Sequence, residues 1–408
     1  MLEKFIENRI NKKIIYFFNK PLVLFIFFGT SITIFFALQY GFFINIQQAI
    51  TTKGTNARLI TIEHSKHKDT IYAYSGAKFI NKEKIADIKH LPNWSVNASN
   101  INNDSNLIMI IPNNNKELTN PRFNAEIIAY NLQSKKQIVI GKDADLLVKP
   151  LFDEKTKTVY YRSTSHNQET RLIQYNLNTR IKKTIFKTNN EMAIFPILAN
   201  KNNLYVIKYD VQGSKLMIIS DMEIKEAAHL SGHFIRDWSI SDDKNQLLFI
   251  EQEANNQYLQ YNIKILNIKN KKYVELNFSK DSYALQKEIL SVTGNTSSKN
   301  RDIVNYFKPI WLNANEMAFG INSILLQNSQ PISIFNISAS RLDKLIPPLK
   351  GLDTPIAFDS YGKNMLVKNI QPEMNYLEKI FVINNELKTR LPIENNNLVI
   401  YANWWYIN

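Results

Sequence analysis

The chain has 408 residues, 44% of them apolar and 12% aromatic, with a formal net charge of +14. Only 11 glycines and 13 prolines are present, which excludes collagen-like, mucin-like and proline-rich disordered classes. The lack of cysteine excludes disulfides, zinc–thiolate sites, iron–sulfur clusters and cysteine nucleophiles.

The positive charge is spread along the chain rather than gathered in one stripe. Its densest cluster lies near the N-terminus, beside an apolar segment, where membrane orientation explains it. We therefore expect no nucleic-acid binding, although the net charge keeps that alternative open.

Residues 22–44 form an apolar run, LVLFIFFGTSITIFFALQYGFFI, of 23 residues without a charged side chain. A helix of about 20 residues crosses the hydrocarbon core of a bilayer. We therefore predict a transmembrane helix over 21–45, with membrane contact through Leu22–Ile44, between a short basic tail (1–20) and a large domain (46–408). The alternatives are a cleaved signal peptide, whose apolar core is about 7–15 residues, and a buried core helix.

Basic residues flank this segment unequally, with more of them before it than closely after it. The cytoplasmic side of a bacterial inner membrane normally carries this excess. The N-terminus is therefore expected in the cytoplasm and 46–408 in the periplasm. The residues concerned are Lys4, Arg9, Lys12, Lys13 and Lys20 before the segment, and Lys53 and Arg58 after it.

The clearest repeat of the large domain runs from Arg236 to Leu276. A short strand holding Trp238 leads into a polar turn, 241–244, and strands are predicted over 247–250, 261–268 and 273–276. Short strands joined by polar turns in this way form one blade of a β-propeller. Similar units start at Pro92, Pro150, Pro196, Pro309 and Pro355, and two are lengthened by inserts, Pro112–Asn124 and Ser279–Phe307.

The last residues of the chain, Tyr401–Trp405, resemble the first strand of another blade. Spare strands lie after the apolar segment, over Leu59–Glu63 and Thr70–Tyr74. We predict that these segments combine into one blade, which closes the ring and leaves no free sheet edge. The fold class is then all-β, a β-propeller of about seven blades preceded by one transmembrane helix. Six or eight blades and a β-sandwich are the alternatives.

The segment Asp237–Phe249, DWSISDDKNQLLF, resembles the TolB-type propeller repeat, which reads Trp-Ser-Pro-Asp-Gly-Lys before a hydrophobic strand. Ile240 stands in place of the proline, and the glycine of the turn is absent. As a pattern, the resemblance covers residues 90–400. A membrane span followed by such a propeller is also similar to the CadC/ToxR-like membrane-bound regulators, here without the winged-helix domain. That resemblance implies a periplasmic sensor part.

Two histidine pairs are the nearest approach to a metal site. His64 and His67 are three residues apart, so on a strand they would face opposite sides. His229 and His233, in a predicted loop, have a spacing that suits zinc on a helix, but Gly232 between them opposes a helix. We therefore expect no metal site and no cofactor.

Acidic and aromatic residues fit structural roles. Asp242 and Asp243 occupy the turn of the clearest repeat, and Asp143 and Asp145 lie in a predicted connection between strands. The sequence has no Gly-x-Ser-x-Gly elbow and no phosphate-binding loop, and we predict that the chain is not an enzyme. The tryptophans at one repeat position are expected to pack between blades, namely Trp94, Trp238, Trp311 and Trp404, with Trp405 on the opposite side of its strand.

The insert 279–307 is the best candidate for partner contact, because loops on a rigid scaffold commonly carry function. Its candidate contact residues are Tyr283, Leu285, Ile289 and Arg301, and a tolerated surface insertion is the alternative. We expect a protein- or ligand-binding module that engages an envelope protein or a small ligand on the propeller face. The alternative function is the sensor component of a membrane-bound transcriptional regulatory system that lacks its own DNA-binding domain.

Overall fold

The computed structural model describes residues 57–407, except 102, 114–121, 165–168, 191, 201–202, 256–257, 275, 277–304, 323–328, 331, 345–349, 360–362, 372–376 and 385–388. The expected cytoplasmic tail (1–20) and transmembrane helix (21–45) lie outside the described residues. Within the described part, no helix is both long and apolar enough to span a bilayer.

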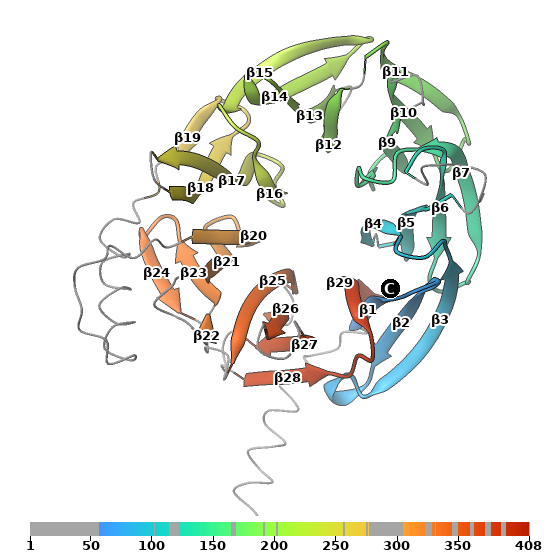
Figure 1. The fold of residues 1–408 in the computed structure, drawn as a ribbon, viewed down its shortest axis with the longest axis vertical. Coiled ribbons are helices and arrows are strands. Elements are labelled where there is room, and N and C mark those ends of the chain that lie inside the picture. The colour runs from blue at the N-terminus through green and yellow to red at the C-terminus, as the bar shows by residue number, and fades with distance from the viewer. Residues whose placement is uncertain are drawn as a thin grey trace, which may run out of the picture. The chain divides into compact units, whose positions relative to one another are not determined.

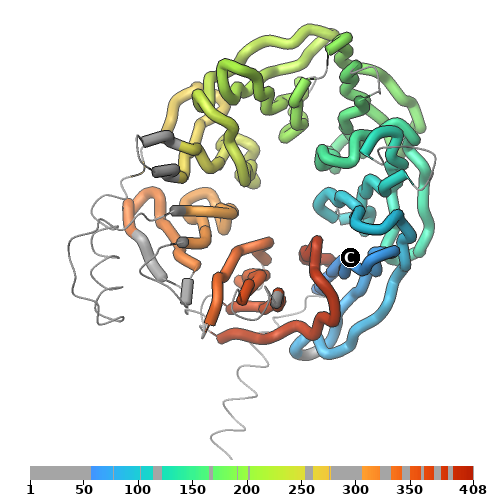
Figure 2. Tube along the Cα trace, in the orientation of Figure 1, coloured from blue at the N-terminus to red at the C-terminus, as the bar shows by residue number. Residues whose placement is uncertain are grey.

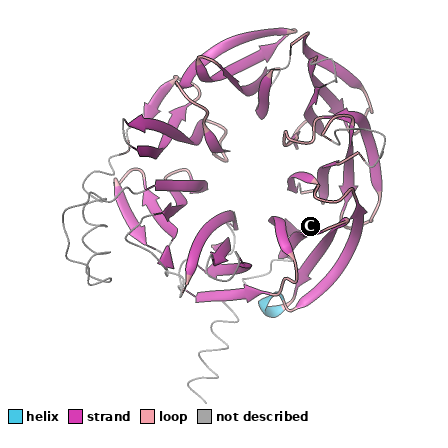
Figure 3. Ribbon diagram, in the orientation of Figure 1, coloured by secondary structure: helices cyan, strands magenta, loops and turns pink. Residues whose placement is uncertain are grey.

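The described residues form seven β-sheets arranged as the blades of a propeller around a central axis (Figure 1). Almost all regular structure is strand, as Figure 3 shows, and the one helical element described is a 3-10 turn, η1 (Ala77–Phe79). The predicted all-β propeller and its count of seven blades are confirmed.

Each blade contains four main strands that follow one another from the ring axis outward. Blade 1 holds β29 (Leu398–Tyr406), β1 (Ala57–Ser65), β2 (Lys68–Ser75) and β3 (Asn81–Lys89). Blade 2 holds β4 (Asn97–Ile101), β5 (Asn106–Ile111), β6 (Ala125–Asn131) and β7 (Gln137–Ala144). Blade 3 holds β8 (Leu151–Asp153), β9 (Thr158–Thr164), β10 (Thr170–Asn176) and β11 (Lys182–Thr188). Blade 4 holds β12 (Ala193–Asn200), β13 (Asn203–Asp210), β14 (Gly213–Ser220) and β15 (Glu223–Ser231).

The remaining blades follow the same order. Blade 5 holds β16 (Arg236–Ile240), β17 (Gln246–Asn255), β18 (Tyr258–Asn267) and β19 (Lys272–Val274). Blade 6 holds β20 (Asn305–Asn313), β21 (Glu316–Asn322), β23 (Ile332–Asn336) and β24 (Arg341–Lys344). Blade 7 holds β25 (Gly351–Asp359), β26 (Asn364–Gln371), β27 (Leu377–Asn384) and β28 (Thr389–Ile393), and the short β22 (Ser329–Gln330) pairs in parallel with β25.

The composition of each strand follows its place in the blade. The second strand of blade 5 carries the run Leu247–Ile250, and all its side chains are fully buried. Such a run has no polar face because the blade is covered on both sides by its neighbours. The outer strand β15 reads EIKEAAHLS, and most of its charged side chains are exposed. Outer strands therefore resist edge-to-edge association with other chains.

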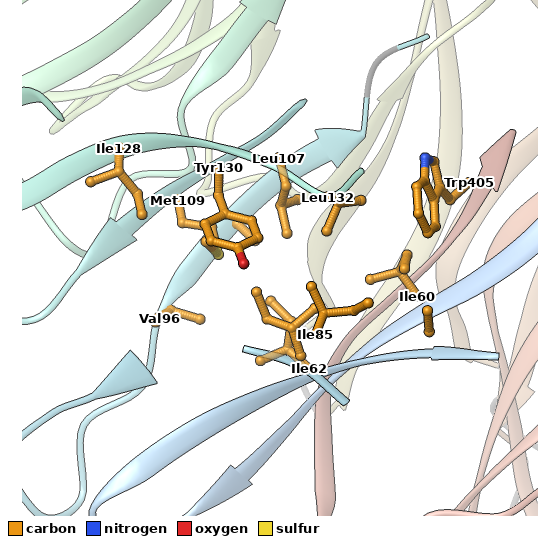
Figure 4. Packing of buried hydrophobic residues seen from close by; sticks show 13 residues of the cluster. Ile60, Ile62, Ile85, Val96, Leu107, Met109, Ile128, Tyr130, Leu132 and Trp405 are labelled. Carbon is orange, nitrogen blue, oxygen red and sulfur yellow. The ribbon is translucent and has the colours of Figure 1, made fainter. Parts of the chain in front are cut away.

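The hydrophobic core is divided among the interfaces between neighbouring blades. Between blades 1 and 2, Ile60 and Ile62 of β1 belong to one buried cluster with Leu107 and Met109 of β5 (Figure 4). Trp405 of β29 lies in the same cluster, and its indole Nε1 donates a hydrogen bond to Ser105 Oγ at 2.8 Å. The closing strand thus contributes to the packing of the next blade as well as of its own.

Two other tryptophans, Trp311 and Trp238, also lie at blade interfaces, as predicted. Trp311 is buried between blades 5 and 6, and its Nε1 donates a hydrogen bond to the Ser239 carbonyl at 3.3 Å. Trp238 packs on the cluster between blades 4 and 5. Trp404 is buried on the side of its strand opposite Trp405 and lies against the ring of Phe79, with 5.7 Å between centroids.

The ring closes through antiparallel pairing of β1 with β29. Leu59 stands opposite Trp404, and Thr61 opposite Ala402. Figure 2 shows the first described residues (blue) and the last (red) side by side at this point. The predicted composite blade is confirmed. Its fourth strand, β3, was not predicted.

A buried carboxylate reinforces this closure. Glu63 of β1, whose side chain has 0% exposure, accepts hydrogen bonds from Lys82 Nζ at 2.7 Å and from the Tyr74 hydroxyl at 3.1 Å. The backbone N–H of Asn396, in the segment leading into β29, donates to its other oxygen at 3.3 Å. Burial and the Glu63 charge raise the pKa of Tyr74, which therefore keeps the proton that it donates.

Several predicted boundaries are wrong, and those of blades 2 and 6 differ most in their consequences. The inner strand of blade 2 begins at Asn97 and not at Pro92, because a turn at Pro92 and Asn93, with φ 66° at Asn93, precedes it. Trp94 follows that turn and packs on the cluster between blades 2 and 3. The inner strand of blade 6 begins at Asn305, inside the segment predicted as an insert.

Replacement of Trp405 tests how much this residue of the closing strand β29 stabilises the closed ring. We expect Trp405→Ala to lower the free energy of unfolding by about 3–5 kcal/mol, because it leaves a cavity and an unpaired Ser105 hydroxyl. Leu398→Ala, in the same strand but 46% exposed, is the matched control, with an expected cost below about 0.5 kcal/mol. Chemical denaturation of the full chain in detergent measures both. Equal losses would contradict the role assigned to Trp405.

Candidate binding site in the central channel

The innermost strands of all seven blades line a central channel of about 1290 Å³. These strands are β4, β8, β12, β16, β20, β25 and β29. The channel wall therefore combines side chains that lie far apart in the sequence, and its shape depends on how the blades pack. Loops and inner strands on such a scaffold are common places for binding residues.

Irregular pairing turns two charged side chains towards the channel. The register of β16 shifts between Arg236 and Ser239, and that of β20 between Phe307 and Ile310. Within these bulges Asp237 has φ 52° and Lys308 φ 48°, a left-handed conformation that costs most residues about 1 kcal/mol or more. Both residues line the channel.

The ion pairs of the channel neutralise most of its cations. Lys308 Nζ lies 2.5 Å from Asp237 Oδ1, and Arg236 lies 3.7 Å from the other oxygen of this carboxylate. Lys368 Nζ lies 2.9 Å from Glu378 Oε2. The pair between Asp237 and Lys308 joins blades 5 and 6 and offsets part of the strain in both bulges.

Lys149 is the exception among these cations. Its Nζ donates a hydrogen bond to Asn100 Oδ1 at 3.2 Å, and no carboxylate of the described residues forms an ion pair with it. The Lys149 side chain is exposed to the water of the channel, which the seven blades enclose. Desolvation and the charge of Lys308 therefore lower the pKa of Lys149 to about 8.

Aromatic side chains lie between the charged groups of the wall. Phe195 and Trp238 are in contact, with 5.3 Å between ring centroids, and both line the channel. The Arg236 guanidinium lies over the Tyr261 ring at 4.2 Å. The wall thus offers both apolar faces and an ammonium, that of Lys149, which has no carboxylate partner among the described residues. Such a surface suits an anionic group carried on an apolar body.

The residues predicted to contact a partner, Tyr283, Leu285, Ile289 and Arg301, lie outside the described residues. The chain that follows the insert is described, because β20 begins at Asn305. Phe307, the last residue of the predicted insert, lines the channel. The insert is thus continuous in sequence with the channel wall.

The histidines are arranged differently from either predicted pair. His67 is exposed in the turn between β1 and β2, whereas His64 lies beside Asp69 and His90. His229 lies in strand β15 and not in a loop, and both it and His233 are exposed. The group of His64, Asp69 and His90 comes from three neighbouring strand ends, so spacing along one strand could not have indicated it.

The acidic residues have structural contacts. Asp243 accepts hydrogen bonds from the Ser241 hydroxyl at 2.6 Å and from the backbone N–H of Asn245 at 3.0 Å, as predicted for a turn residue. Asp145 is fully buried between Arg122 and Arg162. Burial alone would raise the pKa of Asp145, but the hydrogen bond from Arg122 and the charge of Arg162 outweigh it and lower that pKa.

No protein-family model and no curated protein matches the sequence. Among solved structures, the chain is similar to the β-propeller domain of the trilobed protease from Pyrococcus furiosus, which is described as having an open velcro topology. The two are 11% identical, with a TM-score of 0.52, and the match covers 84% of this chain and 96% of that chain. Oligogalacturonate lyase from Vibrio parahaemolyticus is 9% identical, with a TM-score of 0.50 and coverages of 83% and 86%. TolB from Acinetobacter baumannii is 11% identical, with a TM-score of 0.44 and coverages of 86% and 67%. At these identities the similarity shows the propeller fold alone.

The lowered pKa of Lys149 predicts a pH-dependent stability. Since the folded state holds this proton less tightly than the unfolded chain, the charge destabilises the fold below about pH 8. We expect Lys149→Gln to be more stable than the unmodified chain at pH 7, by only about 0.5 kcal/mol because channel water screens the charge. The difference should vanish as the pH rises from 8 towards 10.5, the ordinary lysine value.

Thermal unfolding at several pH values measures this difference. Lys183→Gln, an exposed lysine on the outer strand β11, is the matched control and should show no such trend. A constant difference between Lys149→Gln and the unmodified chain across this pH range would contradict the prediction.

Proposed function

We propose that this chain is a binding module, and not an enzyme, whose central channel binds an anionic group of an envelope protein or of a small ligand. The observation that carries the proposal is Lys149, an ammonium without a carboxylate partner among the described residues, beside Lys308. An anion bound between these groups would relieve their repulsion and gain charge-assisted hydrogen bonds. The neighbouring aromatic rings would cover its apolar part.

The size of the channel favours a protein segment over a small ligand. Pockets for small molecules are typically about 300–1,000 Å³, whereas this channel measures about 1290 Å³. A loop with an acidic side chain at its tip would fill more of it. Its carboxylate would reach Lys149, and its backbone would lie against Phe195 and Trp238.

The proposal includes attachment to the bacterial inner membrane through Leu22–Ile44, with the propeller in the periplasm. The uncharged run and the excess of basic residues before it support this orientation. A tethered propeller searches for partners in two dimensions near the membrane surface, which raises their effective concentration.

The second candidate function is a sensor component of a membrane-bound regulatory system. The observation in its favour is that β1 begins at Ala57, 13 positions after Ile44, and pairs directly with the closing strand β29. A ligand that altered the conformation of blade 1 would therefore act on a strand that directly follows, in sequence, the segment that leads to the membrane.

In-cell crosslinking followed by affinity capture from detergent-solubilised membranes tests the proposal. We expect the full chain to capture a specific envelope protein, and Lys149→Glu to reduce that capture at least about tenfold, because it reverses the unpaired charge. Lys183→Glu makes the same charge change on an outer strand and should capture as well as the unmodified chain. A third variant, lacking residues 279–303, leaves β20 intact and tests the insert.

The outcomes separate the two functions. Loss of the partner in Lys149→Glu supports binding in the channel, and loss in the deletion adds the insert to the binding surface. Equal capture by Lys149→Glu and Lys183→Glu would contradict the proposal. A partner captured only through residues 1–20 would favour the sensor function instead.

A further inference from the structure

Three polar side chains meet at the edge of the interface between blades 1 and 2. His64 at the end of β1 stands directly opposite Asp69 in β2, and His90 follows the last residue of β3. His64 Nδ1 lies 2.7 Å and His90 Nε2 3.1 Å from the same oxygen, Asp69 Oδ1. The side chains of Asp69 and His90 have 0% exposure and that of His64 21%.

One buried nitrogen of this group, His90 Nε2, has no hydrogen-bond partner among the described residues. His90 Nδ1 lies 2.8 Å from the carbonyl oxygen of Leu91, which can only accept, so Nδ1 carries the proton of the ring. His90 Nε2 lies 3.1 Å from Asp69 Oδ1, but this buried atom forms no hydrogen bond within the described residues, and a buried polar atom without a partner is costly.

We propose that His64 Nδ1, Asp69 Oδ1 and His90 Nε2 bind one divalent transition-metal ion, with zinc as the best-suited ion. The two nitrogens lie 2.7 and 3.1 Å from Asp69 Oδ1, and one ligand atom from each of the three residues lies within 4.8 Å of the others. Zinc bonds to nitrogen and carboxylate oxygen are about 2.0–2.2 Å, so its tetrahedral ligands lie roughly 3.3 Å apart. Binding would therefore require side-chain rotation that brings the donors to that spacing, for which the partly exposed His64 has the most room.

The surroundings match those of metal ligands. A histidine ligand commonly donates its other ring N–H to a backbone carbonyl, as His90 does to Leu91. A ligating carboxylate is commonly held by a further hydrogen bond, and Asp69 Oδ2 accepts the backbone N–H of Val96 at 2.7 Å. His64, which donates from Nδ1 to Asp69 in the metal-free protein, would carry its proton on Nε2 when the metal is bound.

The donor set indicates both the metal class and its role. Two imidazole nitrogens and one carboxylate oxygen suit zinc and related ions better than calcium or magnesium, which prefer oxygen ligands. With three protein ligands, the fourth position is left for water on the partly exposed His64 side. The ion would join β1, β2 and the segment that leads into blade 2, and so stabilise the closing blade against its neighbour.

Zinc binding to the full chain tests this inference. The protein is purified in detergent with a tag that lacks histidine, stripped with a chelator and dialysed against zinc or magnesium. We expect one zinc per chain by elemental analysis. Thermal unfolding should shift upward by about 3 °C with zinc at a hundredfold excess over its dissociation constant, and not with magnesium.

Variants of individual histidines show which residues bind the zinc ion. His64→Gln and His90→Gln should weaken zinc binding at least about tenfold, whereas His67→Gln, an exposed histidine three residues from His64, should bind as the unmodified chain does. No zinc in the unmodified chain would overturn the proposal, and this measurement stands even if a variant fails to fold. Equal zinc binding by His64→Gln and His67→Gln would also overturn it. None of these outcomes depends on Lys149 or the channel.

Discussion

The pairing of β1 with β29 is the constraint on which the rest of this structure depends. Each blade buries apolar side chains on both faces, so every blade needs two neighbours, and only a closed ring provides them. The closing strand contributes Trp405 to the packing against blade 2, and Glu63 holds the segment that leads into this strand. The channel exists because the ring is closed, since its wall includes β29 itself.

The sequence predicted those parts of the fold that depend on local patterns of apolar and polar residues. Apolar runs such as Leu247–Ile250, each preceded by a short strand and a polar turn, predicted the blades, and the likeness of Tyr401–Trp405 to such a first strand predicted the closing strand. The outer strands β3 and β15 were missed because they read NKEKIADIK and EIKEAAHLS. They are strands because each pairs with the strand before it, β2 or β14, rather than because of apolar periodicity. The group of His64, Asp69 and His90 was missed because it forms only when three strand ends meet.

Two charged groups of this propeller, the Asp145 carboxylate and the Lys149 ammonium, have contrasting surroundings. The Asp145 carboxylate is enclosed by Arg122 and Arg162, so its charge is compensated within the fold. Lys149 has an amide oxygen as its hydrogen-bond partner and a second lysine nearby. The first arrangement links blades 2 and 3, whereas the second leaves an ammonium whose charge no carboxylate of the described residues compensates. This contrast is more informative than the net charge of the protein, which the scattered surface lysines dominate.

The closed ring also sets an order of events during synthesis. About 340 residues separate the start of β1 from the start of β29, and at about 5–20 residues per second a ribosome takes roughly 20–70 s to make them. For that time one edge of β1 has no partner strand from its own chain, because β29 is the last strand to be made. The nascent protein therefore passes through a long interval in which it can pair with the wrong strand, and its need for chaperones should be greatest just before the last blade is complete.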